Sequence, residues 1–314
     1  MVETMKIGIS SCLLGNKVRF DGGHKRSQFC TDILSEYADY HPVCPEMAIG
    51  LGSPRPTIRL VEKDDVILVT RPNEEDGYGQ NMTSYANSLE EKVKSLTGFI
   101  FCAKSPSCGM ERVKVYDENG VTIRHDGIGA FARRVMEMNP NLPCEENGRL
   151  NDAQIRENFI TRLFVYQKWQ VLASEEITKA KLYDFHSQHK YLVMSHDVEG
   201  YRQLGRLLGE SEKSPEQLAE EYIAGLMKAL KKIATRKKHV NTLQHLQGYF
   251  SKLLSKEEKE ELTQQVHDYR KGLVPFMVPL ALLNHYLKKY PNAYLEKQAY
   301  FSPHPAALRL RVNF

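Results

Sequence analysis

Long apolar runs are absent from this 314-residue sequence. No stretch approaches the roughly 18 consecutive apolar residues that a membrane-spanning helix needs, so we expect no membrane partner. The first residues, MVETMKIGISSC, lack the charged and then apolar pattern of a secretory signal. A composition of 41% hydrophobic and 26% charged residues is typical of a globular protein. Together these features predict a cytoplasmic protein.

Closely spaced cysteine pairs are also missing. The sequence has six cysteines, none of them in a CxxC motif. In a reducing compartment, such cysteines are expected to be free thiols or metal ligands rather than disulfides. Five of the six precede residue 110, which suggests that the first half carries the chemistry. We interpret Cys30, Cys102 and Cys144 as structural, because buried free cysteine is common and usually inert.

Strand signals are confined to the first half. Short β-type runs there alternate with helical spacing of apolar residues. This alternation predicts an α/β, Rossmann-like domain with a mainly parallel sheet. The expected strands are 5–10, 40–44, 58–63, 66–70, 98–103 and 113–117, and the expected helices are 30–38, 78–96 and 129–138.

A segment rich in Pro, Asn and Gly, 139–152, interrupts the pattern and is interpreted as a linker. Long amphipathic patterns follow it, and Pro215 stands where a helix would begin. We therefore predict two domains, 1–145 and 153–314, of which the second is mostly α-helical. Neither half shows a repeat of fixed period.

Three cysteines stand at predicted strand ends or in turns, where metal ligands are often found. Cys12 follows the first strand, Cys44 ends the second, and Cys108 lies in a turn after the strand 98–103. In an open α/β sheet the carboxyl ends of the strands form the ligand crevice, so the three segments can converge. Three thiolates could hold an iron–sulfur cluster with one iron left open. A zinc site completed by a histidine is an alternative, with these candidates: His24, His41 and His125.

Polar residues close to these cysteines suggest a reaction centre. Glu46 is two residues from Cys44, and Ser105 and Ser107 precede Cys108. A carboxylate and hydroxyl groups beside a Lewis-acidic metal suit hydrolytic displacement, because one group handles a proton of water and another positions the substrate. Two arginines on the stretch after residue 52 are candidates to contact a pyrimidine edge or a phosphate, namely Arg55 and Arg59.

Three ordered blocks resemble the signature of the thiouracil desulfidase (TudS) family: SSCLLGNKVRFDG at 10–22, CPEMAIGLGSPRP at 44–56 and KSPSCG at 104–109. The resemblance covers roughly residues 5–145. It implies a [4Fe–4S] cluster held by Cys12, Cys44 and Cys108, whose open iron takes the thiocarbonyl sulfur. It also implies acid–base and substrate-handling roles for Glu46 and Ser105, with Ser107 as the alternative serine.

The second half is basic. Residues 151–314 contain 25 Lys and Arg against 18 Asp and Glu, whereas residues 1–150 contain 18 against 21. Such asymmetry favours a polyanionic partner. A dense basic cluster is a candidate RNA surface and consists of Lys228, Lys231, Lys232, Arg236, Lys237 and Lys238.

The same half resembles the YbgA-type helical domain that occurs fused to desulfidase domains. The resemblance rests on residues 185–197, 239–250 and 269–286. Proteins with this fusion resemble a bacterial enzyme that converts 4-thiouridine in transfer RNA to uridine. We expect this activity, with thiolated tRNA as the partner and no obligate protein partner. Two alternatives remain: desulfurisation of free thiouracil or thionucleosides, and nucleic-acid binding with a structural metal.

Overall fold

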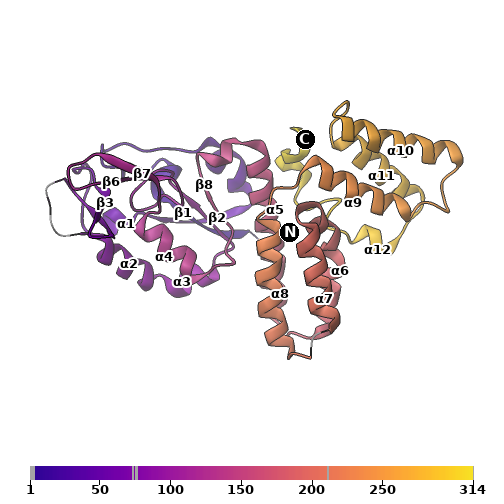
Figure 1. Ribbon diagram of the computed structural model, residues 1–314, viewed down its shortest axis with the longest axis horizontal. Coiled ribbons are helices and arrows are strands. Elements are labelled where there is room, and N and C mark those ends of the chain that lie inside the picture. Colours follow the sequence, from indigo (N-terminus) through magenta and orange to yellow (C-terminus); the bar gives the residue numbers. More distant parts are fainter. Residues whose placement is uncertain (1–3, 73, 75–76, 211, 314) are drawn as a thin grey trace. The chain divides into compact units, whose positions relative to one another are not determined.

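The computed structural model describes residues 4–72, 74, 77–210 and 212–313 (Figure 1). It divides into two compact units, with the division between Asn151 and Asp152. The first unit contains all the strands of the described chain, and the second consists of helices. This arrangement confirms the predicted fold class, an α/β domain followed by a helical one.

Sheet A is a four-stranded parallel sheet in the order β2-β1-β5-β8. Its strands are β1 (Met5–Ser10), β2 (Ala38–Val43), β5 (Gly98–Phe101) and β8 (Cys144–Glu146). The β1 strand is almost entirely buried, as expected for a central strand of a parallel sheet. Ser10 at its end pairs in register with Val43, and Ile9 with Ile100, so the carboxyl ends of β1, β2 and β5 lie together.

Sheet B is a second, mixed sheet that the sequence did not separate from the first. Its order is β4-β3-β6-β7, with β3 parallel to β6 and the other neighbours antiparallel. The strands are β3 (Arg59–Lys63), β4 (Val66–Thr70), β6 (Val113–Tyr116) and β7 (Thr122–Gly127). We did not predict β7, because four consecutive exposed residues give it no alternation of polar and apolar positions.

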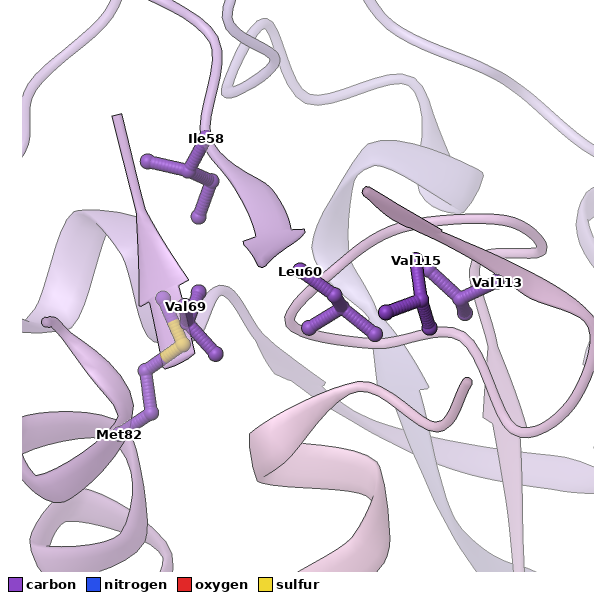
Figure 2. Packing of buried hydrophobic residues seen from close by; sticks show 6 residues of the cluster. All are labelled: Ile58, Leu60, Val69, Met82, Val113 and Val115. Atoms are coloured by element: carbon purple, nitrogen blue, oxygen red, sulfur yellow. The ribbon is translucent and has the colours of Figure 1, made fainter. Parts of the chain in front are cut away.

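Apolar side chains of sheet B pack against helix α2 (Gly79–Ser88). Figure 2 shows Met82 of this helix pointing at Val69. In the same cluster, Leu60 of β3 lies near Val113 and Val115, which are alternate residues of β6. The other helices of the unit are α1 (Pro45–Ala48), α3 (Glu90–Ser95) and α4 (Ala130–Met138). The expected helix 30–38 is instead a π-helix, Phe29–Ile33, followed by a 3₁₀ turn, Leu34–Glu36.

The segment interpreted as a linker, 139–152, belongs to the first unit up to Asn151. Strand β8 occupies its middle, pairs with β5 through Phe99 and Cys144, and is fully buried. Cys144 is therefore a core residue of sheet A and not a linker residue. The interpretation was wrong because a three-residue strand is too short to show periodicity.

The second unit is built from eight α-helices within its described residues. Helix α6 contacts α7, α8 and α9, and α9 contacts α10 and α11. Pro215 is the first residue of α8, as predicted, and Ser214 closes a capping box there. The helices are α5 (Ala153–Ala173), α6 (Lys179–His196), α7 (Val198–Glu210), α8 (Pro215–Leu230), α9 (Arg236–Gly248), α10 (Lys256–Lys271), α11 (Met277–Lys289) and α12 (Ala293–Glu296).

Two buried polar side chains contact the turn within residues 228–238, where α8 ends and α9 has yet to begin. Asn158 donates from Nδ2 to the carbonyl of Leu230 at 2.8 Å, and His196 Nδ1 lies 2.7 Å from the carbonyl of Lys232. These side chains bind the carbonyls that end α8, and the chain turns before α9 begins.

A buried carboxylate lies on the same helix as Asn158. Glu157 Oε1 is 3.3 Å from Arg311 Nε and 3.6 Å from His304 Nε2. Burial alone would raise the pKa of Glu157, but these neighbours outweigh it and lower the pKa to about 2. The ionised carboxylate is therefore part of the folded core.

None of the helices in the described part of the chain combines the length and the apolar composition that crossing a membrane requires.

Candidate active site

The three predicted cysteine ligands lie just beyond three adjacent parallel strands. Cys12 is in the 3₁₀ turn Ser11–Leu14 after β1, Cys44 is the N-cap of α1 after β2, and Cys108 is in the loop after β5. Because β1 lies between β2 and β5, the fold brings these segments to one edge of sheet A. Cys12 and Cys108 are buried, and Cys44 is half-buried.

All three cysteines line one cavity of about 600 Å³. Glu46, Arg55, Arg59 and Ser105 also border it, whereas Ser107 does not. The walls include further cations at Arg19, Lys25 and Lys104, and Glu46 is the one acidic side chain among the lining residues. The cavity is therefore electropositive and suited to an electron-rich ligand.

Cys102 is a fourth thiol of this cavity that sequence reasoning assigned to the interior of a strand. Strand β5 ends at Phe101, so Cys102 follows its strand exit just as Cys12 and Cys44 do. Its backbone N–H donates to Ser10 Oγ at 2.9 Å, and its thiol contacts that of Cys12. The position after a strand was the available signal, hidden by a strand predicted two residues too long.

The thiols of the predicted ligands resist ionisation in this environment. The hydrogen bond to Cys102, together with burial, raises the pKa of Cys12, and burial raises the pKa of Cys44 and of Cys108. Three thiolates in these buried and half-buried positions need a compensating positive charge. The donor set therefore fits a soft, cationic metal group that binds sulfur.

Glu46 is fixed by a buried arginine. Arg55 donates from Nε to Glu46 Oε2 at 2.8 Å, and the Arg55 side chain is 3% exposed against 13% for Glu46. The remaining donors of Arg55 reach the carbonyls of Gly52 and Val18. Arg55, a predicted candidate to contact the substrate, borders the cavity, and its hydrogen bonds within the protein hold Glu46 in place.

The two serines form a hydrogen-bonded chain that ends on Glu46. Ser107 donates from Oγ to Glu46 Oε1 at 2.5 Å, and the Ser105 and Ser107 hydroxyls are 2.9 Å apart. Because the Ser107 proton is used toward Glu46, Ser105 is the donor of the second bond. Only Ser105 faces the cavity, since Ser107 is 0% exposed. The serines thus have different positions: Ser105 at the cavity and Ser107 between it and the carboxylate.

The loop that carries the serines and Cys108 is held from two sides. The backbone N–H groups of Phe131 and Ala132 in α4 donate to the Ser107 carbonyl, both at 3.1 Å. Glu146 of β8 accepts from the N–H of Met110 at 2.8 Å and from that of Glu111 at 3.3 Å. These contacts fix the backbone on which the site depends.

The predicted basic cluster of the second unit is divided by its own contacts. Lys232 forms an ion pair with Asp197 at 2.5 Å, Lys238 donates to the His196 carbonyl at 2.5 Å, and the Arg236 guanidinium lies over the Tyr269 ring. These three side chains therefore contact the end of α6 and helix α10 within the same unit. The exposed members without such a contact in the described chain are Lys228, Lys231 and Lys237.

The zinc alternative finds no support in this arrangement. Among the described residues, no three His, Cys, Asp or Glu side chains are grouped closely enough to surround one metal ion. His24, His41 and His125 do not line the cavity. A four-iron cluster spreads its ligands over several metal atoms and therefore places its thiolates farther apart than one ion does.

Comparison with known proteins gives matches for each part of the chain. Residues 7–147 match the model of the 2-thiouracil desulfurase family, and residues 190–305 match that of DUF1722, a family of unknown function. The uncharacterised protein YbgA of Escherichia coli strain K12 is 28% identical over 164 residues, 52% of this chain and 97% of that protein.

A solved structure is also similar to part of the chain. It is a [4Fe–4S]-dependent thiouracil desulfidase, TudS, at 23% identity with a TM-score of 0.35, covering 47% of this chain and 94% of that protein. The two family models thus match separate parts of the chain, one within each compact unit.

Proposed function

We propose that this chain, which joins a 2-thiouracil desulfurase-family domain to a DUF1722 domain, converts 4-thiouridine in tRNA to uridine with a [4Fe–4S] cluster. The observation that carries the proposal is the single cavity in which three thiols meet a carboxylate linked to a hydroxyl chain. The balanced reaction takes the thiocarbonyl and water to the carbonyl and hydrogen sulfide.

The cluster would be held by Cys12, Cys44 and Cys108, which leaves one iron without a protein ligand. When bound, it would supply a soft Lewis acid that withdraws electrons through the sulfur of the substrate and accepts that sulfur as the leaving group. The match of residues 7–147 to the desulfurase family and the three thiols of the cavity support this choice of cofactor.

The residues of the chain handle the proton of the attacking water. Ser105 faces the cavity and can accept the water proton while passing its own proton to Ser107, which passes one to Glu46. Arg55 holds the carboxylate that receives it. Ser105 is therefore the catalytic serine, Ser107 relays the proton from Ser105 to Glu46, and Arg55 is a positioning residue that acts through Glu46.

The choice of RNA rests on the second unit and on charge. A free thiobase is small and needs no further binding surface, whereas a folded RNA needs many phosphate contacts. The exposed lysines of the second unit, Lys228, Lys231 and Lys237, are available for such contacts.

Anaerobically purified protein should be brown and contain about four irons and four sulfides per chain. Incubation with bulk tRNA should remove its 4-thiouridine and release one sulfide for each nucleoside converted. Cys108→Ala should lose the iron, while Cys102→Ala, its matched control in the same cavity, should retain it. A protein without iron, or tRNA that keeps its 4-thiouridine, would refute the proposal. Faster conversion of free 4-thiouracil than of tRNA would refute the choice of substrate.

A further inference from the structure

A second cavity of about 290 Å³ adjoins the active-site cavity within the first unit. Arg59, Lys104 and Tyr116 border both cavities, so the two form one continuous depression. Basic side chains line the second cavity, and its lining residues include no Asp or Glu. We call it the basic groove and define it by Arg59, Lys104, Arg112, Lys114 and His125.

The fold gathers these residues from four separate segments. Arg59 begins β3, Lys104 and Arg112 lie in the loop between β5 and β6, Lys114 is in β6, and His125 is in β7. Strand alternation turns Lys114 away from the buried neighbours Val113 and Val115, which face the core in Figure 2. The groove is thus the solvent side of sheet B.

The positive charge of the groove is largely uncompensated. Lys104 and Lys114 are exposed and form no ion pair within the described chain, in contrast to Lys63, which pairs with Glu118. Arg112 does have a partner, Glu111, at 2.9 Å. Close placement of unpaired cations is unfavourable unless an anion binds between them.

Arg59 gives an independent sign of a missing ligand. Its Nε is buried and has no hydrogen-bond partner among the described residues, although its guanidinium lies 5.4 Å from the centre of the Tyr116 ring. An unsatisfied buried donor is unfavourable, and the guanidinium to which it belongs borders both cavities. Arginine stacked on an aromatic ring with free donors is well suited to a phosphate oxygen.

The position of the groove indicates the source of the phosphate. A nucleotide whose base enters the active-site cavity leaves its sugar and phosphates at the cavity mouth, where Lys104 and Tyr116 continue into the groove. We propose that the basic groove binds the strand phosphates next to the nucleotide being desulfurised, so that the first unit itself favours a polynucleotide over a free base. This inference rests on the proposed function and assigns the strand contact of the same site.

Binding can be measured without turnover. The probe is a fluorescein-labelled single-stranded oligoribonucleotide with ordinary uridine, and the readout is anisotropy over a range of salt concentrations. The variant Arg112→Gln/Lys114→Gln removes two groove cations that do not border the active-site cavity. Glu111 keeps Arg149 at 2.9 Å and is not left unpaired.

Binding weakens as salt rises, so the slope of log K against log salt is negative. For this double variant, the slope should become shallower by about 1.4, because each phosphate that a cation neutralises on a single strand contributes roughly 0.7 to its magnitude. The matched control is Lys6→Gln/Lys92→Gln, which removes the same charge from exposed positions that line neither cavity. An equal slope change in both variants, or no change in either, overturns the groove assignment.

Kinetics with the same oligoribonucleotide containing one 4-thiouridine separate this inference from the proposed function. The groove variant should raise KM and leave kcat within about twofold, because the groove binds the strand and not the reacting atoms. If wild type binds the strand with the groove-dependent slope but converts no 4-thiouridine, the proposed function fails and the groove stands. If 4-thiouridine 5′-monophosphate has as low a KM as the oligoribonucleotide, the strand assignment is overturned in favour of a single-phosphate site.

Discussion

The hydrogen-bonded chain from Ser105 through Ser107 to Glu46 predicts that removing any one of the three side chains lowers turnover as much as removing two of them. Ser107→Ala removes a hydroxyl that donates to the carboxylate at 2.5 Å and accepts from Ser105. The cavity wall does not change, because Ser107 is fully buried and does not line the cavity. The Ser107 hydroxyl lies 3.8 Å from the thiol of the proposed ligand Cys108, so iron content has to be measured for each variant. We therefore expect a loss in kcat with KM nearly unchanged.

The magnitude follows from what general base catalysis contributes, about 10²–10⁴-fold. We take the lower value, a 100-fold decrease in kcat, which corresponds to an activation barrier higher by about 2.7 kcal/mol. This decrease is expected for each of the single variants Ser105→Ala, Ser107→Ala and Glu46→Gln. If the residues act in one chain, Ser107→Ala/Glu46→Gln should again lose about 100-fold, because the chain is already broken. Independent contributions would multiply to about 10⁴-fold.

The assay is single-turnover conversion of thiolated RNA, with rates expressed per iron-loaded enzyme. The matched control is Ser195→Ala, since Ser195 is also 0% exposed and donates one hydrogen bond, to the Leu192 carbonyl at 2.7 Å. The control variant should lower the free energy of unfolding by a similar amount and leave kcat unchanged. A double variant near 10⁴-fold would refute the relay, and full activity of Ser107→Ala would remove Ser107 from the mechanism.

Three further results are expected. Arg55→Met should lower the free energy of unfolding in urea by about 3–5 kcal/mol, because it leaves a buried carboxylate unpaired; a loss under 1 kcal/mol would contradict the buried pair. Glu157 stabilises the fold above its unfolded-state pKa of 4.5, and about 3 kcal/mol should be lost as pH falls from 4.5 toward 2; acid denaturation of Glu157→Gln should lack this component. Gly129→Ala would place a Cβ 2.5 Å from the Ser107 backbone and should lower iron content, whereas Gly205→Ala, with open space around it, should not; equal iron in both would contradict the loop geometry.

Much of the first unit was predictable because the composition of its strands is distinctive. Strands β1, β3, β4 and β6 lie within one residue of the expected ranges, since each is an apolar or alternating run. Strands β7 and β8 were missed, because one is exposed along most of its length and the other has three residues. The strand order and the separation into two sheets are set by tertiary pairing and have no local signal.

The convergence of the site cysteines could be predicted from the positions of strand ends, but the hydrogen bonds between the site residues could not. Position after a strand led to Cys12 and position at a strand end led to Cys44, and the same reasoning would have found Cys102. The contact between Arg55 and Glu46 depends on where the chain from residue 49 to 54 returns, which no spacing rule gives. The distinct positions of the two serines likewise depend on side-chain direction in one loop.

Strand β8 determines where the protein can be truncated to obtain the first unit alone. Glu146, two residues after Cys144, holds the backbone of the loop that follows Cys108, and it lies only a few residues before the start of the helical unit. A fragment that stops at the Pro- and Asn-rich segment would contain all the predicted ligands and still lack the support for one of them. A minimal catalytic fragment must therefore extend to residue 151, and loss of activity in a shorter one would say nothing about the helical half.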